Sequence, residues 1–270
     1  MPTIKQNNIR LSFKQIIKFN ILLSILFSTV LLGEEIKLAT VHEFPPYSFN
    51  TKENGLSGID IEIIAELFKR MNRAYSIKPY PVQRAQYLVE KQSLDGMVTT
   101  TPYMTDKLSE RLWRSDTLYT ATVSIFINRQ HKPALNQRLS HNKFCVSIGF
   151  LSSTSPKSVG LTQSDYLDVR LVQRLPQLVN LLVQNQVDCV IAEDISFIYQ
   201  AKLMQKADQV FLLQELADRD SFITLNKNLA QQNPQLTKSI NSTIAKLQKA
   251  QFIDDLIIKY LELPLRSWKQ

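Results

Sequence analysis

Hydroxyl and carboxyl groups follow two similar apolar segments of the chain, 94–98 and 187–192. Each segment comes after the end of an amphipathic helix and a short polar turn, a pattern typical of a strand buried in a parallel sheet. Ligands of open α/β sheets bind at the carboxyl ends of such strands. We therefore expect these groups to face a ligand, one set from each half of a repeated fold. The groups are Thr99, Thr100 and Thr101 after the first segment, and Glu193 and Asp194 after the second.

The two acids are the more informative set, because a charge that faces a cleft needs a partner. Burying an unpaired carboxylate is costly, so Glu193 or Asp194 in a cleft implies a cationic or hydrogen-bonding ligand. A structural alternative stays open, in which the acids cap a helix that begins at Ile195. A second alternative is that two ordinary helix–strand units share the pattern by coincidence.

Aromatic side chains follow the first predicted strand. Residues 36–41 alternate between apolar and polar side chains, which predicts a strand, and the prolines at 45–46 then enforce an extended turn. The turn presents Phe44, Tyr47 and Phe49 at the carboxyl end of that strand. An aromatic ring there can pack against the flat or apolar part of a small ligand. We expect at least one of the three to belong to the core instead.

Composition indicates a globular protein of one or two domains. The chain has 270 residues, of which 44% are hydrophobic and 21% charged. The net charge of +8 falls to +4 without residues 1–33, which contain four basic residues and no acid. The remainder has no concentrated basic run, which argues against nucleic-acid binding.

Residues 1–33 resemble a secretory signal peptide. A basic region ends at Lys18, and the apolar stretch 21–32 is shorter than the roughly 20 residues that span a bilayer. Gly33 suits the last position before cleavage, and no cysteine follows that could carry a lipid anchor. An uncleaved membrane anchor is the alternative. Cleavage and export would place the protein in a bacterial periplasm.

Cysteine and histidine usage predicts no metal site and no cofactor. The chain has two cysteines, Cys145 and Cys189, and an exported protein permits a disulfide between them. Cys145 lies in a predicted strand, 144–148, that should pair beside the strand of Cys189. Two buried thiols remain an equal alternative. The three histidines, His42, His131 and His141, lack metal-ligand spacing.

Helical periodicity and turn residues outline the rest of the chain. Apolar residues at helical spacing predict a helix over 59–71, with Asp60 and Glu62 favoured in its first turn by the helix dipole. Further predicted elements are a strand at 75–80, a helix ending near residue 91, a strand at 119–127, a return strand at 221–227, and helices at 233–250 and 251–260.

The order of these motifs resembles the bacterial extracellular solute-binding proteins of family 3 over about 36–261. Four motifs carry the resemblance: the Pro-Pro-Tyr-Ser-Phe turn, the Gly-Ile-Asp-Ile-Glu helix start at 58–62, the Pro-x-x-Arg helix start and the Asp-Gly followed by threonines. The resemblance implies an α/β, two-lobed fold of the periplasmic-binding-protein type II class. Its ligand cleft lies between two α/β lobes joined by a two-strand hinge. The implied divisions are 34–126 and 221–270 for the first lobe and 127–220 for the second.

The resemblance also implies a function. Members of the family are partners of ABC transporters, so we expect a non-enzymatic, monomeric protein that captures a small polar solute, an amino acid or a derivative, by lobe closure. A periplasmic ligand sensor without a transporter is the alternative. A cyclohexadienyl-dehydratase-like enzyme, with Glu193 or Glu43 as general acid, is a further one.

The family's site residues can be carried over position by position. An arginine after the threonines holds the ligand carboxylate in the family, but this chain has Lys107 at the gapless position and Arg111 four residues later. Glu193 aligns with the acid that meets the ligand ammonium, and Phe44 with the stacking aromatic. Arg84 is a second candidate for an anionic group. Ser153 and Thr154 fall where the family has a Gly-Ser/Thr loop.

Overall fold

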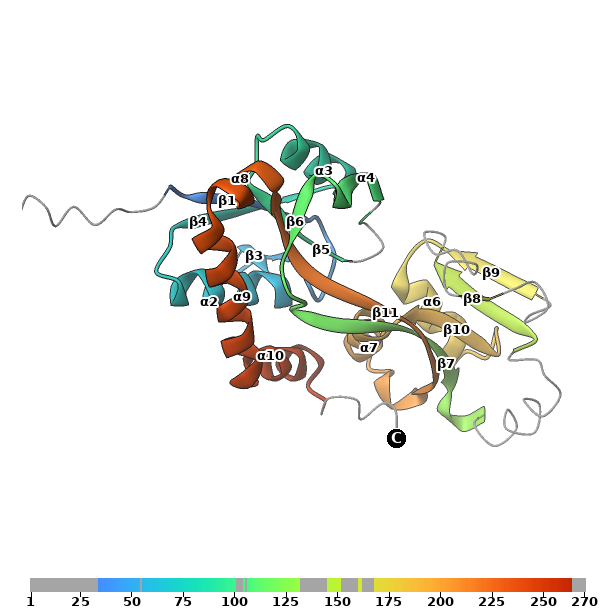
Figure 1. Ribbon diagram of the computed structural model, residues 1–270. Coiled ribbons are helices and arrows are strands. Elements are labelled where there is room, and N and C mark those ends of the chain that lie inside the picture. Colours follow the sequence, from blue (N-terminus) through green and yellow to red (C-terminus); the bar gives the residue numbers. More distant parts are fainter. Residues whose placement is uncertain are drawn as a thin grey trace, which may run out of the picture. The chain divides into compact units, whose positions relative to one another are not determined.

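The computed structural model builds the chain as a mixed α/β fold (Figure 1). The residues that it describes are 34–53, 55–100, 104, 106–131, 145–151, 160–161 and 168–263. The predicted signal peptide, 1–33, lies outside them, as do Thr101, Ser153 and Thr154. No helix among the described residues is long and apolar enough to cross a membrane.

The secondary structure alternates between strands and helices along the chain. The first part contains β1 (Ile36–Val41), β2 (Phe49–Thr51), β3 (Gly55–Ser57), α2 (Ile59–Arg70), β4 (Tyr75–Tyr80), α3 (Val82–Glu90), β5 (Gly96–Thr100), α4 (Asp106–Ser109) and β6 (Leu112–Arg114). The middle part contains β7 (Tyr119–Asn128), η2 (Arg129–His131), β8 (Ser147–Leu151), β9 (Asp168–Val172), α6 (Leu175–Val183), β10 (Cys189–Glu193), α7 (Asp194–Leu203) and η5 (Ala207–Gln209). The last part contains β11 (Val210–Asn226), α8 (Lys227–Gln232), α9 (Pro234–Lys249) and α10 (Phe252–Leu261).

One sheet connects the two halves of the fold, with strand order β4-β1-β5-β11-β7-β10-β8-β9 and β6 paired to β11. The strands β4, β1 and β5 are parallel to one another, and so are β10, β8 and β9. Between them β7 and β11 pair antiparallel, as two long strands that lie alongside each other in Figure 1. This long pair is the connection between the two parallel sections.

The β7–β11 ladder is irregular near its middle. Its register shifts between Leu212 and Gln214 and again between Glu215 and Ala217. Such bulges make a strand bend and increase its local twist. The bend in β11 therefore lies between the two parallel sections of the sheet.

The core of the first section is built by the amphipathic face of α2. Its apolar side chains belong to the same buried cluster as Leu38 and Val98 of the sheet and Ile244 of α9. Each fully buried side chain of this kind contributes about 1.5–3 kcal/mol to stability. The opposite face of the sheet is covered by α3, whose Ala85 and Val89 pack with Met97. The buried residues of α2 are Ile59, Asp60, Ile63, Ile64, Leu67 and Phe68.

Helix α7 differs from α2 because it is buried on several sides. Phe197, Ile198 and Ala201 are fully buried and belong to the same cluster as α2 and α6. A helix that is apolar all round is typical of the interior of a fold. The hydrophobic core is therefore continuous from α2 through α7 to α6.

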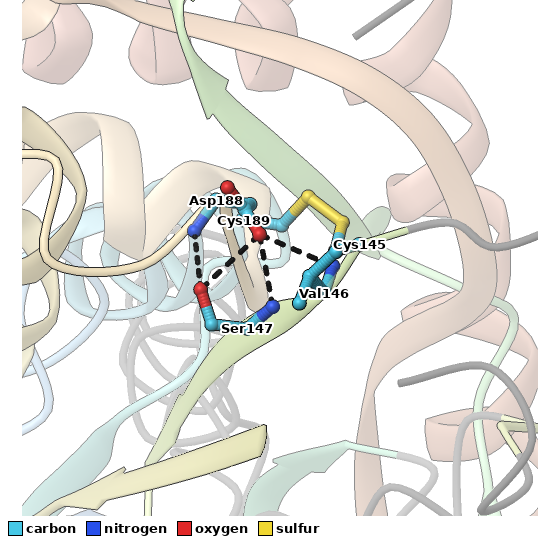
Figure 2. The surroundings of a disulfide bond; sticks show 5 residues. All are labelled: Cys145, Val146, Ser147, Asp188 and Cys189. Atoms are coloured by element: carbon cyan, nitrogen blue, oxygen red, sulfur yellow. Dashed lines mark hydrogen bonds between the residues drawn. A yellow bond between two sulfur atoms is a disulfide. The ribbon is translucent and has the colours of Figure 1, made fainter. Parts of the chain in front are cut away.

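A disulfide joins Cys145 to Cys189, which decides between the two alternatives that the sequence left open (Figure 2). The carboxylate of Asp188 reinforces the junction, because Oδ2 accepts hydrogen bonds from the backbone N–H groups of Val146 at 3.1 Å and Ser147 at 2.9 Å. The Ser147 hydroxyl in turn accepts a bond from the Asp188 N–H at 3.0 Å. These contacts hold the start of β8 beside β10.

The predicted elements agree closely with the observed ones except for two strands. The strand predicted at 144–148 overlaps only the start of β8, Ser147–Leu151. The other exception is the return strand. It was expected over 221–227, whereas β11 begins at Val210 and has 17 residues. The residues from Gln214 to Asp220 are largely polar and incompletely buried. They lack the alternation of apolar and polar side chains that predicts a strand. The prediction of its start was therefore wrong by eleven residues.

Candidate functional site

The turn that carries Phe44 and Tyr47 is fixed by the start of α2. The first N–H groups of a helix have no partner within it. Here the N–H of Ile59 donates to the Pro46 carbonyl at 2.9 Å, and the N–H of Asp60 donates to the Tyr47 carbonyl at 3.0 Å. The turn and the helix therefore position each other.

Tyr47 is buried between two aromatic rings, with only 3% of its surface exposed. The Phe44 ring lies 5.0 Å away and the nearly parallel Tyr119 ring 5.7 Å away. Its hydroxyl donates a hydrogen bond of 2.7 Å to Oε1 of Glu193. Burial and the neighbouring Glu193 charge raise the pKa of Tyr47 well above its usual value, so the hydroxyl is a neutral donor.

Glu193 occupies the N-cap position of α7. Its Oε1 accepts the backbone N–H of Ile195 at 3.0 Å, and its Oε2 accepts that of Ser196 at 3.2 Å. The capping role that the sequence left open is therefore real. A carboxylate can accept about four hydrogen bonds, two at each oxygen. With Tyr47 counted, Oε1 accepts two hydrogen bonds and Oε2 accepts one from the backbone.

Asp194 is buried directly beside this carboxylate. Its Oδ1 accepts hydrogen bonds from the N–H groups of Thr122 at 3.0 Å and Ile195 at 2.8 Å. Burial and then the charge of Glu193 raise the pKa of Asp194 to about 8. Asp194 therefore holds its proton to a higher pH than a free carboxyl group, and Glu193, which is the less buried of the two, is the acid that a ligand can reach.

A second tyrosine–acid pair lies behind the first. The Tyr119 hydroxyl donates to Oδ1 of Asp60 at 2.6 Å, and both residues are buried. Burial raises the pKa of Asp60 to about 7, although the Tyr119 hydrogen bond opposes that shift. The sequence interpretation missed both residues: Asp60 was explained by the helix dipole, and Tyr119 as a strand residue. An acid within the buried face of α2 was the available signal.

Replacing Asp60 with asparagine should flatten the dependence of stability on pH. The folded pKa of Asp60 is about 7 against about 3.9 unfolded, so between these values the folded state holds a proton that the unfolded state releases. Stability therefore falls as pH rises through this window, by up to about 1.4 kcal/mol per pH unit. Asparagine keeps an acceptor for Tyr119 and removes this slope. Urea unfolding between pH 4 and 8 measures the difference.

The matched control for this prediction is Glu66→Gln, on the exposed side of the same helix. The Arg70 hydrogen bond lowers the pKa of Glu66, so its contribution changes at lower pH. An Asp60→Asn protein with the wild-type slope between pH 5 and 7 would contradict the assignment.

The threonines of the first segment end β5, next to the long strand pair. Thr99 is buried and its hydroxyl has no hydrogen-bond partner among the described residues, whereas Thr100 is partly exposed. Thr100 pairs with Ser221 of β11, which also pairs with Tyr119. The end of β5 therefore lies across one strand from Tyr119, which stacks on Tyr47.

The three basic candidates contact residues outside the group around Tyr47 and Glu193, or are exposed. Lys107 is exposed on α4. Arg111 forms an ion pair with Glu90 at 3.1 Å, and Arg84 is exposed over the ring of Tyr87 at 5.4 Å. The described residues therefore bring Phe44, Tyr47, Glu193 and Asp194 together. They give no contact between this group and any of the three basic side chains.

Metal binding has no support in the described part of the chain. No group of three or more histidine, cysteine, aspartate or glutamate side chains there could hold an ion.

Glu43, the other candidate for a general acid, is exposed and accepts a hydrogen bond from Asn50 at 3.1 Å.

Comparison with solved structures shows the same fold in amino-acid-binding proteins. The second substrate-binding domain of a putative amino acid ABC transporter from Streptococcus pneumoniae matches with a TM-score of 0.69 and 19% identity, over 84% of this chain and all of that one. The second substrate-binding domain of Lactococcus lactis GlnP matches with a TM-score of 0.69 and 16% identity, over 86% and 97% of the two chains. An ancestral cationic amino acid solute binding protein matches with a TM-score of 0.68 and 17% identity, over 84% and 95%.

These likenesses confirm the two-lobed α/β fold of the type II periplasmic binding proteins. No curated protein sequence matches the chain. The model of one family does match it, over residues 36–262, which covers the whole span of the predicted resemblance. The chain belongs to the bacterial extracellular solute-binding proteins, family 3.

Proposed function

We propose that this protein captures a small solute with a cationic nitrogen, an amino acid or a derivative of one, between its two lobes. It presents the solute to an ABC permease in the inner membrane and catalyses no reaction. Family membership supports solute binding. The substrate-binding domain of a putative amino acid ABC transporter and an ancestral cationic amino acid solute binding protein share this fold, which supports the ligand class.

The observation that carries the proposal is the state of the Glu193 carboxylate. It lies at the carboxyl end of β10, and its Oε2 accepts a single backbone hydrogen bond, from the N–H of Ser196. The groups bound to it are two backbone N–H groups and one hydroxyl, and no basic side chain of the described residues forms an ion pair with it. A ligand ammonium would supply the missing positive charge through a charge-assisted hydrogen bond.

The aromatic residues and threonines would contact the neutral parts of the ligand. Phe44 is partly exposed beside the buried Tyr47, so it is the ring that can lie against the ligand. The hydroxyls of Thr99 and Thr100 offer hydrogen bonds at the end of β5. Thr101, Ser153 and Thr154 lie outside the described residues and stay part of the proposed site on the family's pattern.

Lys107 is our candidate for the anionic end of a ligand. Arg111 is already paired with Glu90, and Arg84 lies over Tyr87. Lys107 follows the threonines on α4 and is exposed. A lysine is a point charge that binds a carboxylate less selectively than an arginine fork. We therefore expect this site to discriminate weakly between ligand carboxylates.

The cellular side of the proposal rests on residues 1–33. We propose that they direct export and are removed, which leaves a monomeric periplasmic protein that begins near Glu34. The periplasm also suits the disulfide, because such bonds persist in oxidising compartments.

The test is a calorimetric binding screen of the protein, purified after export, against the twenty standard L-amino acids and their decarboxylated amines. We expect at least one to bind. For the tightest of them, Glu193→Gln should weaken binding about 100-fold, which corresponds to about 2.7 kcal/mol. Glutamine keeps an oxygen that caps α7, so the fold should stay intact.

The matched control is Glu66→Gln, which removes a partly exposed carboxylate that pairs with Arg70 at 2.8 Å. It should leave affinity unchanged. Wild-type affinity in the Glu193→Gln protein would overturn the placement of the site, and a screen without any binder would overturn the ligand class.

A further inference from the structure

Besides sharing a hydrophobic core with α2, helix α7 of the second lobe makes polar or aromatic contacts with the first lobe near its start, middle and end. At the start, Glu193 accepts the bond from Tyr47. In the middle, the ring of Tyr199 lies 6.2 Å from that of Phe49. At the end, Lys202 Nζ donates to the Tyr260 carbonyl at 3.2 Å, and it pairs with Glu262 at 2.9 Å.

The three contacts differ in strength. The side chain of Glu262 is 73% exposed, so its ion pair with Lys202 is screened by water and contributes little. The Phe49–Tyr199 pair has no polar component. The Tyr47–Glu193 bond is short, its donor is buried, and its acceptor is a carboxylate, so it is the strongest of the three.

Tyr47 has no freedom to make this bond elsewhere. Its ring is held between Phe44 and Tyr119, and its backbone carbonyl accepts the Asp60 N–H at the start of α2. Moving Glu193 away would therefore leave a buried hydroxyl without an acceptor, which is unfavourable. The bond can only form when the two lobes are close at this point.

We propose that the Tyr47–Glu193 hydrogen bond is a latch that favours the closed arrangement of the lobes independently of ligand. The inference rests on the proposed function, because it assumes that the same carboxylate receives the ligand. The bond from Tyr47 is made to Oε1, so a ligand that binds Oε2 does not compete with the latch. Tyr47 is thus a positioning residue, which acts on the ligand through Glu193.

The test compares lobe separation in the protein without ligand. Spin labels at Gln83→Cys on α3 and Asn180→Cys on α6, both exposed positions, report the distance between the lobes by double electron–electron resonance. The native cysteines are joined in the disulfide, so only the introduced thiols react. Tyr47→Phe should lower the ratio of closed to open molecules about tenfold, because it removes one hydrogen bond to a charged acceptor and keeps the ring.

The matched control is Tyr260→Phe. It also removes a tyrosine–glutamate bond, of 2.6 Å to Glu62, but both partners belong to the first lobe. Its distance distribution should equal that of the wild type. Glu193→Gln, a weaker acceptor that still caps α7, is the second variant. It should shift the distances in the same direction as Tyr47→Phe and by less.

Identical distance distributions in the wild type, Tyr47→Phe and Glu193→Gln would overturn the latch. The binding screen is read separately, so the two proposals can fail separately. If an amino acid binds but Tyr47→Phe does not change the lobe separation, the latch is wrong and the proposed function is supported. If Tyr47→Phe opens the lobes but no amino acid binds in the screen, the latch is supported and the proposed ligand class is wrong.

Discussion

Replacing both Cys145 and Cys189 with alanine should lower the free energy of unfolding by about 4 kcal/mol, since the disulfide closes a loop across a sequence separation of 44 residues. The cross-link removes conformations from the unfolded chain, and this effect grows with loop length. Both cysteines are almost fully buried, so alanine leaves no unpaired polar group. Urea unfolding of the wild-type and double-alanine proteins without reductant measures the difference.

Reduction offers an independent version of this experiment. Reduced wild-type protein should unfold at nearly the same urea concentration as the double-alanine protein. The Asp188 bonds to Val146 and Ser147 should survive in both, which predicts that β8 stays paired with β10. If the oxidised and reduced wild-type proteins unfold at the same urea concentration, the disulfide has no stabilising role.

Gly58→Ala should destabilise the protein by at least about 3 kcal/mol, through backbone strain and a steric clash together. Gly58 precedes α2 with φ +132°, a conformation that residues with a side chain rarely adopt. A methyl group there would overlap the carbonyl group of Tyr47. The clash would displace the turn that carries Tyr47, so we also expect weaker ligand binding. Thermal unfolding and the calorimetric screen measure the two effects.

Gly55→Ala separates strain from clash. Gly55 also has positive φ, +67°, but a methyl group there meets nothing within 4 Å. Its cost should be about 1 kcal/mol, with ligand affinity unchanged. Equal losses of stability in the two variants would mean that the contact between Gly58 and the Tyr47 backbone is unimportant.

The sequence predicts the first section of the fold well, because its elements carry clear local patterns. Helix α2 has apolar residues at helical spacing, and its predicted range of 59–71 differs from the observed one by a single residue. The strand β1 occupies its predicted range. The start of β11 was missed because polar residues between 214 and 220 satisfy no single-face pattern.

The site was predictable in its parts but not in its contacts. Glu193 and Tyr47 were each selected from the end of a predicted strand. Their hydrogen bond joins positions 146 residues apart, and no local periodicity encodes such a pairing. The Tyr119–Asp60 pair was missed for the same reason, since each residue has an adequate local explanation. Its helical spacing from Ile64 and Leu67 places Asp60 on the apolar face of α2, but only the position of the partner strand shows that Tyr119 meets it.

The irregular pairing of β11 with β7 lies close to the carboxylate that we propose for the ligand. Val123 of β7 pairs with Glu193 on one side and with Ala217 on the other. Ala217 borders one of the two register shifts at which β11 bends. The carboxylate that would meet the ligand is thus two strand spacings, about 10 Å, from the irregular part of the β7–β11 ladder. A displacement of Glu193 can reach that part through backbone hydrogen bonds alone, without a relay of side chains.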